Sequence, residues 1–260
     1  MKIFAVSDIH SFFTVFHNEL KKKGFEENNP DHLLIICGDC FDRGRETVEL
    51  LEYLNKINNK VIVKGNHELL IEEVWRRGGC RGHDLNNGTM TTIQDIFYKY
   101  SNIEPYEPIR VSEKILKPFI DKMIPYFETK NYVFVHGWIP MKYDISKPFA
   151  EYSDPTLFDE NWRNGDWEQA AWFNGIKQAN RGIVIPDKTI VCGHWHCSWG
   201  WHLKSIKTDH WISQFDDNAR WDPYVAEGII AIDRCTAHTK ECNVIVLEDE
   251  LLDESICTNT

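Results

Sequence analysis

Leu33-Leu34-Ile35-Ile36-Cys37 is an unbroken apolar run, and Gly38-Asp39-Cys40-Phe41-Asp42-Arg43-Gly44 follows it directly. A strand that is apolar at every position suits a sheet that is covered on both faces. The glycines on either side of the acidic residues indicate a turn at which the backbone approaches another group closely. The stretch therefore predicts a buried strand whose carboxyl end carries two aspartates and an arginine.

Short apolar runs of the same kind recur along the chain. They cover residues 2–7, 61–64, 132–135, 189–192, 229–232 and 244–247. Helical patterns separate the first three strands: residues 14–23 end at Gly24, and residues 46–57 repeat leucine-type side chains at helical spacing. The order β-α-β-α-β predicts a layered α/β fold with central mixed β-sheets flanked by helices.

We expect a single domain over residues 1–260 that carries two insertions. Residues 69–128 have helical patterning and form a cap, whereas residues 138–187 are rich in Trp, Asn, Asp and Pro and predict an irregular segment with one helix near 166–179. The acidic end of the chain predicts a solvated tail. Its acidic residues are Glu248, Asp249, Glu250, Asp253 and Glu254.

Composition limits the partners that the chain can have. The 260 residues are 42% hydrophobic, enough for a core, and carry a net charge of −11 that repels nucleic-acid polymers. No apolar run is long enough to cross a membrane and the first residues lack an export signal, so we expect a cytoplasmic protein. The eight cysteines are then expected to be reduced thiols. The sequence leaves the oligomeric state open.

Polar residues of ligand type follow five of the expected strands in turn. They are Asp8 and His10, Asp39 and Asp42, Asn66 and His67, His136, and His194 and His196. In open α/β sheets ligands bind beyond the carboxyl ends of the strands, so these residues can meet in one crevice. Carboxylate, imidazole and amide oxygen suit divalent manganese, iron and zinc. Two such ions close together need a shared anionic ligand, which an aspartate can supply.

At these positions the chain resembles the calcineurin-like metallophosphoesterases, and among them the PPP-type serine/threonine phosphatases of the bacterial type. The matching pieces are Asp8-Ile9-His10, Gly38 to Gly44, Gly65-Asn66-His67-Glu68, His136-Gly137 and Gly193-His194-Trp195-His196, in the family's order. Residues 82–89 also resemble the loop that follows the Asn-His motif in bacterial members. One piece alone would be weak, but five in order are specific.

The resemblance implies a role for each matching residue. Asp8, His10, His196 and Asp39 would hold the first metal ion, and Asn66, His136, His194 and Asp39 the second, with Asp39 as the bridge. His67 would protonate the leaving oxygen, oriented by Asp42. Arg43 would clamp phosphate oxygens, together with Asn66 and a second arginine, for which Arg163 is the first choice and Arg181 the second.

Other interpretations of these residues stay open. Cys37 and Cys40 could form a redox pair, or a zinc site with Cys192 and Cys197, but free cysteines are more often small buried hydrophobes. Nine of the ten tryptophans lie beyond residue 137. They are expected to pack the insertion, although Trp138, Trp162 or Trp195 could instead line a substrate entrance.

The sequence therefore predicts hydrolysis of phosphate monoesters by a two-metal mechanism, with phosphorylated proteins as the first choice of substrate. One alternative is a nucleotide hydrolase of the diadenosine tetraphosphate type, which would benefit from stacking tryptophans. Another is a catalytically silent scaffold that keeps the fold, because fold does not dictate function.

Overall fold

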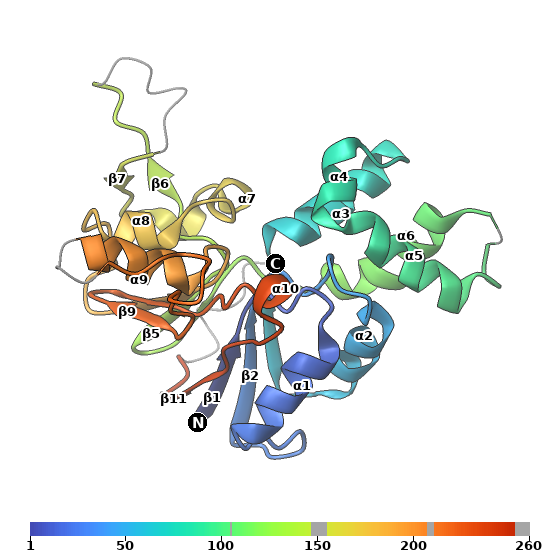
Figure 1. Cartoon of the computed structure of the whole chain (residues 1–260), viewed down its shortest axis with the longest axis horizontal. Helices are drawn as coiled ribbons and strands as arrows, with labels where there is room; N and C mark the ends of the chain where they lie inside the picture. Colours follow the sequence, from blue (N-terminus) through green and yellow to red (C-terminus); the bar gives the residue numbers. More distant parts are fainter. Residues whose placement is uncertain (105, 147–154, 207–210, 253–260) are drawn as a thin grey trace.

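Two β-sheets form the centre of the molecule in a computed structural model that describes residues 1–104, 106–146, 155–206 and 211–252. The first sheet has the order β11-β1-β2-β3. Strands β1 (Lys2–Val6), β2 (His32–Cys37) and β3 (Lys60–Val63) run parallel, and β11 (Ile245–Glu248) pairs antiparallel with β1. Helices α1 (Phe13–Lys22) and α2 (Thr47–Lys56) connect the parallel strands and lie on one side of them (Figure 1).

The second sheet has the order β4-β5-β8-β10-β9. Strands β5 (Tyr132–Phe134), β8 (Thr189–Cys192) and β10 (Ile229–Ala231) are parallel, while β4 (Phe127–Glu128) and β9 (Tyr224–Ala226) are antiparallel edges. Strands β6 (Met141–Lys142) and β7 (Leu157–Phe158) pair antiparallel in a separate two-stranded sheet. The mixed α/β fold predicted from the sequence is confirmed, and the strands that the sequence did not predict are β4, β6, β7 and β9.

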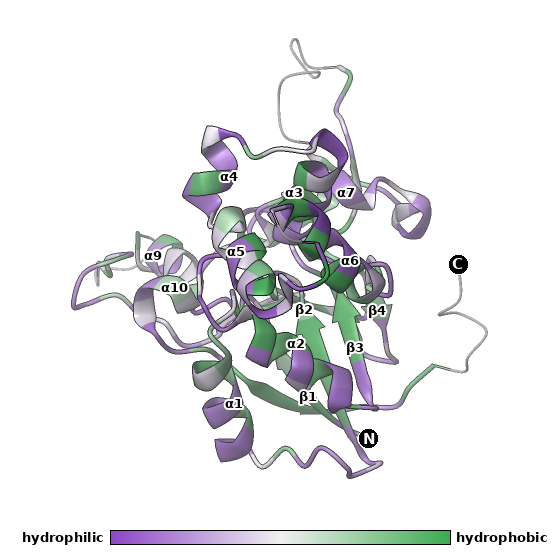
Figure 2. Cartoon of the chain, turned by 90° about the vertical axis from the view of Figure 1, so that its right-hand side faces the viewer, coloured by the Kyte–Doolittle hydropathy of each residue, from purple (hydrophilic) through white to green (hydrophobic). Residues whose placement is uncertain are grey.

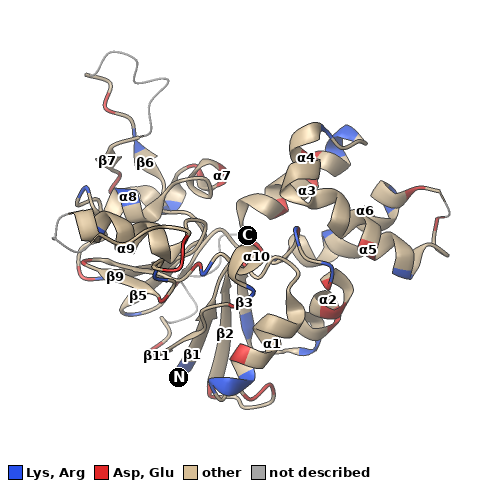
Figure 3. Cartoon of the chain, viewed as in Figure 1, with Lys and Arg blue, Asp and Glu red and all other residues tan. Residues whose placement is uncertain are grey.

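The two sheets pack face to face through the side chains that alternate along their strands. Ile3, Ala5 and Ile35 of the first sheet meet Phe134 and Val191 of the second. The opposite face of the first sheet packs under α1 and α2, so β1 and β2 are apolar after their first residues, Lys2 and His32, as the hydropathy colouring shows (Figure 2). Full burial of one such side chain contributes about 1.5–3 kcal/mol to stability. Charged residues are spread over the helices, the strand ends and the loops (Figure 3).

The expected helical segment follows β3 and stands beside the end of the first sheet (Figure 1). It consists of α3 (Asn66–Arg77), α4 (Gly82–Asn87), α5 (Thr89–Tyr100) and α6 (Pro108–Ile120). Gly78, in the left-handed conformation with φ of 65°, ends α3, and Gly88, with φ of 85°, ends α4 and begins α5. Because glycine adopts this conformation without a steric penalty, the chain can reverse there.

The expectation of one helix over residues 166–179 is wrong. Two short helices, α7 (Trp167–Ala170) and α8 (Gly175–Ala179), replace it, after the 3₁₀ turn η2 (Trp162–Asn164). Asp166 caps α7 by accepting from the Gln169 N–H, and Asn174 caps α8 by accepting from the Lys177 N–H. Asp and Asn side chains compete for backbone donors and so start new helices instead of continuing old ones. Helix α9 (Cys197–Ile206) follows β8, and α10 (Thr236–Thr239) follows β10.

The acidic end of the chain is partly buried, which corrects the prediction of a solvated tail. Asp249 is 7% exposed and accepts hydrogen bonds from the Thr129 hydroxyl at 2.6 Å and the Asn131 N–H at 2.9 Å. The tail therefore anchors the turn before β5. Asp253 and Glu254 lie outside the described residues. Among the described helices, none combines the length and the apolar character that a membrane crossing requires.

Candidate metal centre and active site

The carboxyl ends of the parallel strands of both sheets meet at one place. The Asp8 N–H donates to the Gly38 carbonyl at 3.1 Å, and the Gly193 N–H donates to the His136 carbonyl at 2.9 Å. Two bonds cross between the sheets: the His194 N–H donates to Asp8 Oδ2 at 3.0 Å, and His136 Nδ1 lies 2.9 Å from the Cys37 carbonyl. Residues that are far apart in sequence are thus held at a common rim.

The loops at this rim adopt backbone conformations that few residues tolerate. Non-glycine residues with positive φ include Asp8, His10, Asp39, Asp42, Arg43 and His194, with φ between 51° and 72°. Such strain costs about 1–3 kcal/mol at each residue and is concentrated at functional sites. Gly65 and Gly193 allow the loops to pack tightly, because a Cβ at either position would collide with a carboxylate oxygen of Asp39 or Asp8.

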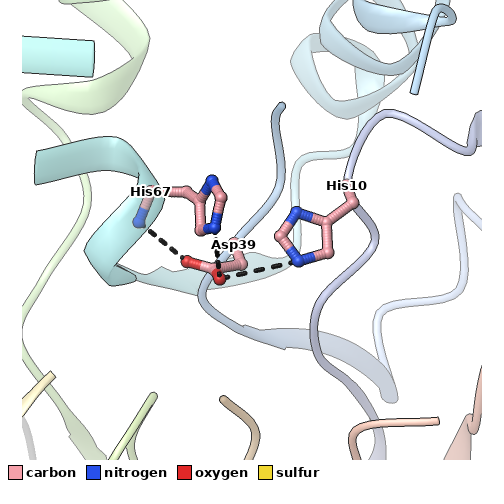
Figure 4. Close-up of side chains that lie close together, drawn as sticks. All are labelled: His10, Asp39 and His67. Carbon is pink, nitrogen blue, oxygen red and sulfur yellow. Dashed lines mark hydrogen bonds and ion pairs between the residues drawn. The ribbon is translucent and has the colours of Figure 1, made fainter. Parts of the chain in front are cut away.

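Asp39 lies at the centre of two groups that could each hold a metal ion. His10, Asp39 and His67 form one group and Asp39, His136 and His194 the other, with the candidate ligand atoms of each within 4.8 Å of one another. Asp39 Oδ2 lies 3.7 Å from His10 Nε2 and 3.9 Å from His67 Nε2 (Figure 4). Asp39 Oδ1 lies 3.3 Å from His136 Nε2. The same carboxylate therefore faces both groups with different oxygens.

The pKa of Asp39 reflects its surroundings. Burial alone would raise this pKa, but the imidazoles of His136, His67, His10 and His194 together lower it below the ordinary value. Burial lowers the pKa of His136 and, with His136 as its neighbour, lowers that of His194 to about 3. At neutral pH the centre thus presents the Asp39 carboxylate beside the neutral imidazoles of His136 and His194, which are the forms that bind metal ions.

Hydrogen bonds at the far side of two imidazoles direct their other nitrogen inward. His10 Nδ1 lies 3.0 Å from the Phe41 carbonyl, and His136 Nδ1 bonds the Cys37 carbonyl. Because a carbonyl only accepts, each Nδ1 carries the proton and each Nε2 presents a lone pair. His136 Nε2 then faces Asn66 Oδ1, another acceptor, at 2.7 Å. Converging acceptors without a donor fit a bound cation.

Asp233 is a buried carboxylate at this centre that the sequence analysis missed. It is 6% exposed and follows β10, the sixth strand to bring a ligand-type side chain to the rim. Burial raises the pKa of Asp8 well above its ordinary value, and repulsion from Asp233 and Asp39 raises it further. Burial also raises the pKa of Asp233, to about 6. Buried carboxylates this close repel each other, and a divalent cation would remove that cost.

His67 lies beside the centre with partners on both ring nitrogens. Its Nδ1 is 2.8 Å from Asp42 Oδ2, and its Nε2 is 3.2 Å from Arg43 Nη2. Burial alone would lower the pKa of His67, but Asp39 and Asp42 raise it above the ordinary value. Asp42 orients the imidazole through Nδ1 and leaves Nε2 on the side of Arg43, where this nitrogen must carry a proton before it can donate one to a leaving group.

Glu68 is a second residue that the sequence analysis left without a role. It is fully buried and accepts from the backbone N–H groups of Asp39, Cys40 and Gly65 at 2.9–3.0 Å. Burial raises its pKa to about 7. Glu68 fixes the turn that carries Asp39 to the start of α3. The Gly-Asn-His-Glu pattern, with an acid at the third helical position, was the available signal.

Two further expected site residues, His196 and Arg163, have hydrogen-bond partners that can be named. His196 Nδ1 lies 2.7 Å from the Ser198 hydroxyl, and its ring packs on Phe215 and Trp221. Arg163 donates two hydrogen bonds to Glu128, at 2.9 and 2.6 Å, and lies over the Trp162 ring. Arg163 is therefore paired away from the cluster, whereas the Nδ1 hydrogen bond of His196 leaves its Nε2 as a possible metal ligand, as in His10 and His136. Arg181, the second choice, is exposed and donates to Gln178 at 3.4 Å.

The tryptophans mostly pack the second core. Trp138 is 0% and Trp162 is 2% exposed, so neither can line an entrance, and both belong to the cluster around the second sheet. Trp195 is partly buried, with its ring 6.4 Å from that of His194. Trp172, which the sequence analysis did not single out, is 48% exposed, and its ring centroid lies 6.3 Å from that of His194.

The cysteines beside the rim are buried thiols. Cys37, Cys40, Cys192 and Cys197 are each at most 1% exposed, and all seven described cysteines are free. Burial raises the pKa of each of these four thiols well above its ordinary value. Because the thiolate is the reactive and metal-binding form, the arrangement favours small apolar packing residues over redox or zinc chemistry.

Comparison with known proteins agrees with this geometry. Residues 1–198 match the family described as calcineurin-like phosphoesterase. The chain therefore belongs to the calcineurin-like phosphoesterases, which are hydrolases, and its His and Asp clusters could bind metal ions.

Two curated relatives have different names. A symmetrical bis(5'-nucleosyl)-tetraphosphatase of Buchnera aphidicola subsp. Schizaphis graminum is 34% identical over 165 residues, which cover 62% of this chain and 54% of the relative. Serine/threonine-protein phosphatase 2 of Escherichia coli K12 is 30% identical over 110 residues, 39% of this chain and 49% of the relative. The chain thus spans about half the length of these relatives. A cold-active protein tyrosine phosphatase shares the fold, with a TM-score of 0.58 and 15% identity over 95% of this chain and 73% of that one.

Proposed function

We propose that the chain hydrolyses phosphate monoesters with two divalent metal ions, and that phosphorylated protein side chains are its substrates. The observation that carries the proposal is the position of Asp39 in both candidate metal groups, beside an imidazole that Asp42 orients. Manganese, iron and zinc all suit this donor set of carboxylates, imidazoles and an amide oxygen. The E. coli relative, a serine/threonine-protein phosphatase by name, supports the substrate class.

The proposed ligands are divided between two ions. Asp8, His10, His196 and Asp39 would hold one, with Asp233 close by, and Asp39, Asn66, His136 and His194 would hold the other. Such ions would supply positive charge for the phosphate and make a bound water more acidic. They would also attract a dianionic substrate to a chain whose net charge is −11.

The protein's own residues would do the remaining chemistry. Arg43 offers a planar pair of donors to phosphate oxygens, which a lysine would match less well. His67 would donate the proton from Nε2 to the leaving oxygen, and Asp42 holds Nδ1 so that the ring keeps this orientation. Glu68 holds Asp39 next to the start of α3, so that Asp39 can bind the metal ions while His67 donates its proton.

A substrate screen tests the proposal. Protein stripped of metal and reloaded with Mn²⁺, Fe²⁺ or Zn²⁺ is assayed with phosphoserine and phosphothreonine peptides, p-nitrophenyl phosphate and dinucleoside polyphosphates. We expect metal-dependent release of phosphate from the peptides. Background rates on every substrate, in protein that contains both ions, would support the scaffold interpretation.

Hydrolysis of dinucleoside polyphosphates is a second candidate function, and Trp172 favours it. This half-exposed ring next to His194 could stack on a nucleobase while the phosphates lie at the metal centre. The Buchnera relative, a tetraphosphatase by name, points the same way. Trp172→Ala should then raise KM for dinucleoside polyphosphates at least tenfold and leave p-nitrophenyl phosphate unaffected, with Trp172→Phe intermediate. Equal KM values for wild type and Trp172→Ala would remove this argument.

A further inference from the structure

The side chain of Asp42 accepts its hydrogen bonds mainly from helices α3 and α5. Its Oδ2 accepts from the Thr89 hydroxyl at 2.7 Å and from His67 Nδ1 at 2.8 Å, and its Oδ1 accepts from the Thr92 hydroxyl at 2.9 Å. The Asp42 N–H donates in turn to Thr92 Oγ1 at 2.8 Å. Thr92 and Asp42 therefore close a ring of two hydrogen bonds.

Thr89 is the first residue of α5 and Thr92 follows three positions later, so both side chains lie on the same face of the helix. Thr89, Thr92 and Asp42 are all 0% exposed, so water cannot replace either hydroxyl. Gly88, directly before α5, lies against the Arg43 backbone, where any Cβ would collide. The cap thus approaches the Asp42–Arg43 turn closely, and the contact is a built part of the centre.

We infer that Thr89 and Thr92 are positioning residues that hold the proton donor through Asp42. A carboxylate with two oxygens and no other fixed donors can rotate about its last bond and present either oxygen to His67. The two hydroxyls fix that rotation, because each occupies a different oxygen. Asp42 Oδ2 then stays opposite His67 Nδ1, and His67 Nε2 stays directed at Arg43.

The inference gives the helical insertion a part in the reaction. None of the proposed metal ligands lies in α5, so loss of the two hydroxyls should leave metal binding intact and impair protonation of the leaving group. This consequence rests on the proposed function. The hydrogen-bonded arrangement itself does not, so it can be tested separately.

The first experiment measures the arrangement without any turnover. Nuclear magnetic resonance of the histidine side chains should show a downfield Nδ1 proton for His67, assigned by its loss in His67→Asn. We expect this resonance to shift or broaden in Thr89→Val/Thr92→Val, to return in Thr89→Ser/Thr92→Ser, and to be unchanged in Thr91→Val, the neighbouring threonine of the same helix. An unchanged resonance in the folded valine variant would overturn the inference.

The second experiment compares leaving groups in protein with equal metal content. Alkyl leaving groups need a proton, whereas p-nitrophenolate departs without one. Because a general acid contributes about 10²–10⁴-fold, Thr92→Val should lower kcat for an alkyl phosphate or phosphoserine peptide about tenfold or more. For p-nitrophenyl phosphate the loss should stay within about threefold, with serine restoring both. Equal losses on both substrates would contradict the inference, whereas a wild type inactive on every phosphoester would contradict the proposed function alone.

Discussion

The loops of the two sheets contribute differently to the rim. After β1, β2 and β3 the chain places Asp8, His10, Asp39, Asn66 and His67 close to one another. After β5 and β8, His136 and His194 join the same cluster and the Nδ1 of His196 bonds Ser198, but Arg163 is paired with Glu128. In the proposed function, the loops of the first sheet would therefore supply the proton donor and most of the ligands, and the loops of the second sheet would supply further histidine ligands.

The largest effect is expected for substitution of Asp39, the residue that both proposed metal ions share. Asp39→Asn removes one negative charge from between the two groups, so we expect protein-bound metal to fall below one equivalent and activity to reach background. Metal analysis after gel filtration checks this, with Asp31→Asn, an exposed aspartate just before β2, as the control. Retention of two ions would show that another residue bridges.

His67→Asn should separate chemistry from metal binding. We expect both ions to stay bound and turnover to slow by about 10²–10⁴-fold, the usual contribution of a general acid. His17→Asn, a replacement of a histidine in α1, should change neither. If metal is lost together with activity, His67 acts as a ligand, consistent with its place in the group around His10.

These two predictions concern residues that the sequence could locate. The loops after β1 to β3 are short and carry glycines and positive φ values, so local sequence largely determines where each side chain lies, and Glu68 then ties the loop after β2 to the start of α3. Asp39 and His67 were therefore predictable from their spacing to an apolar strand.

Long-range partners were not predictable in the same way. Arg163 lies in an insertion where Glu128, from a strand that the sequence did not indicate, satisfies its guanidinium. Nothing in the pattern around Arg163 marks that pairing. Asp233 shows the opposite case, because it follows an expected strand like every other ligand candidate, yet no family motif marks it and it was overlooked.

Asp233 offers a test of whether the second sheet contributes more than its histidines. Asp233→Asn removes a buried carboxylate beside Asp8, so the affinity for one ion should fall about 10–100-fold, the usual effect of losing an outer partner of a metal site. Calorimetric titration of stripped protein with Mn²⁺ measures this, and Asp222→Asn, an exposed aspartate, provides the control. Unchanged affinity for both ions would show that Asp233 takes no part in metal binding and that the ligands come from the loops after the five other strands.

Arg163→Ala should have the smallest effect on activity. Its two hydrogen bonds go to a buried carboxylate that keeps Lys188 at 2.9 Å, so we expect a loss of about 1–2 kcal/mol in the free energy of unfolding. The kinetic constants should remain within about twofold. Denaturant unfolding and a phosphatase assay check the two parts, with Arg163→Lys as the conservative variant. A tenfold rise in KM would instead indicate that Arg163 binds the phosphate group of the substrate.

Two metal ions are proposed to share Asp39, and electron paramagnetic resonance of manganese-loaded protein tests this most directly. With two equivalents of Mn²⁺ bound, we predict the multiline spectrum of an exchange-coupled pair, which Asp39→Asn abolishes. A spectrum of isolated Mn²⁺ ions in the wild type, at full loading, would contradict the account.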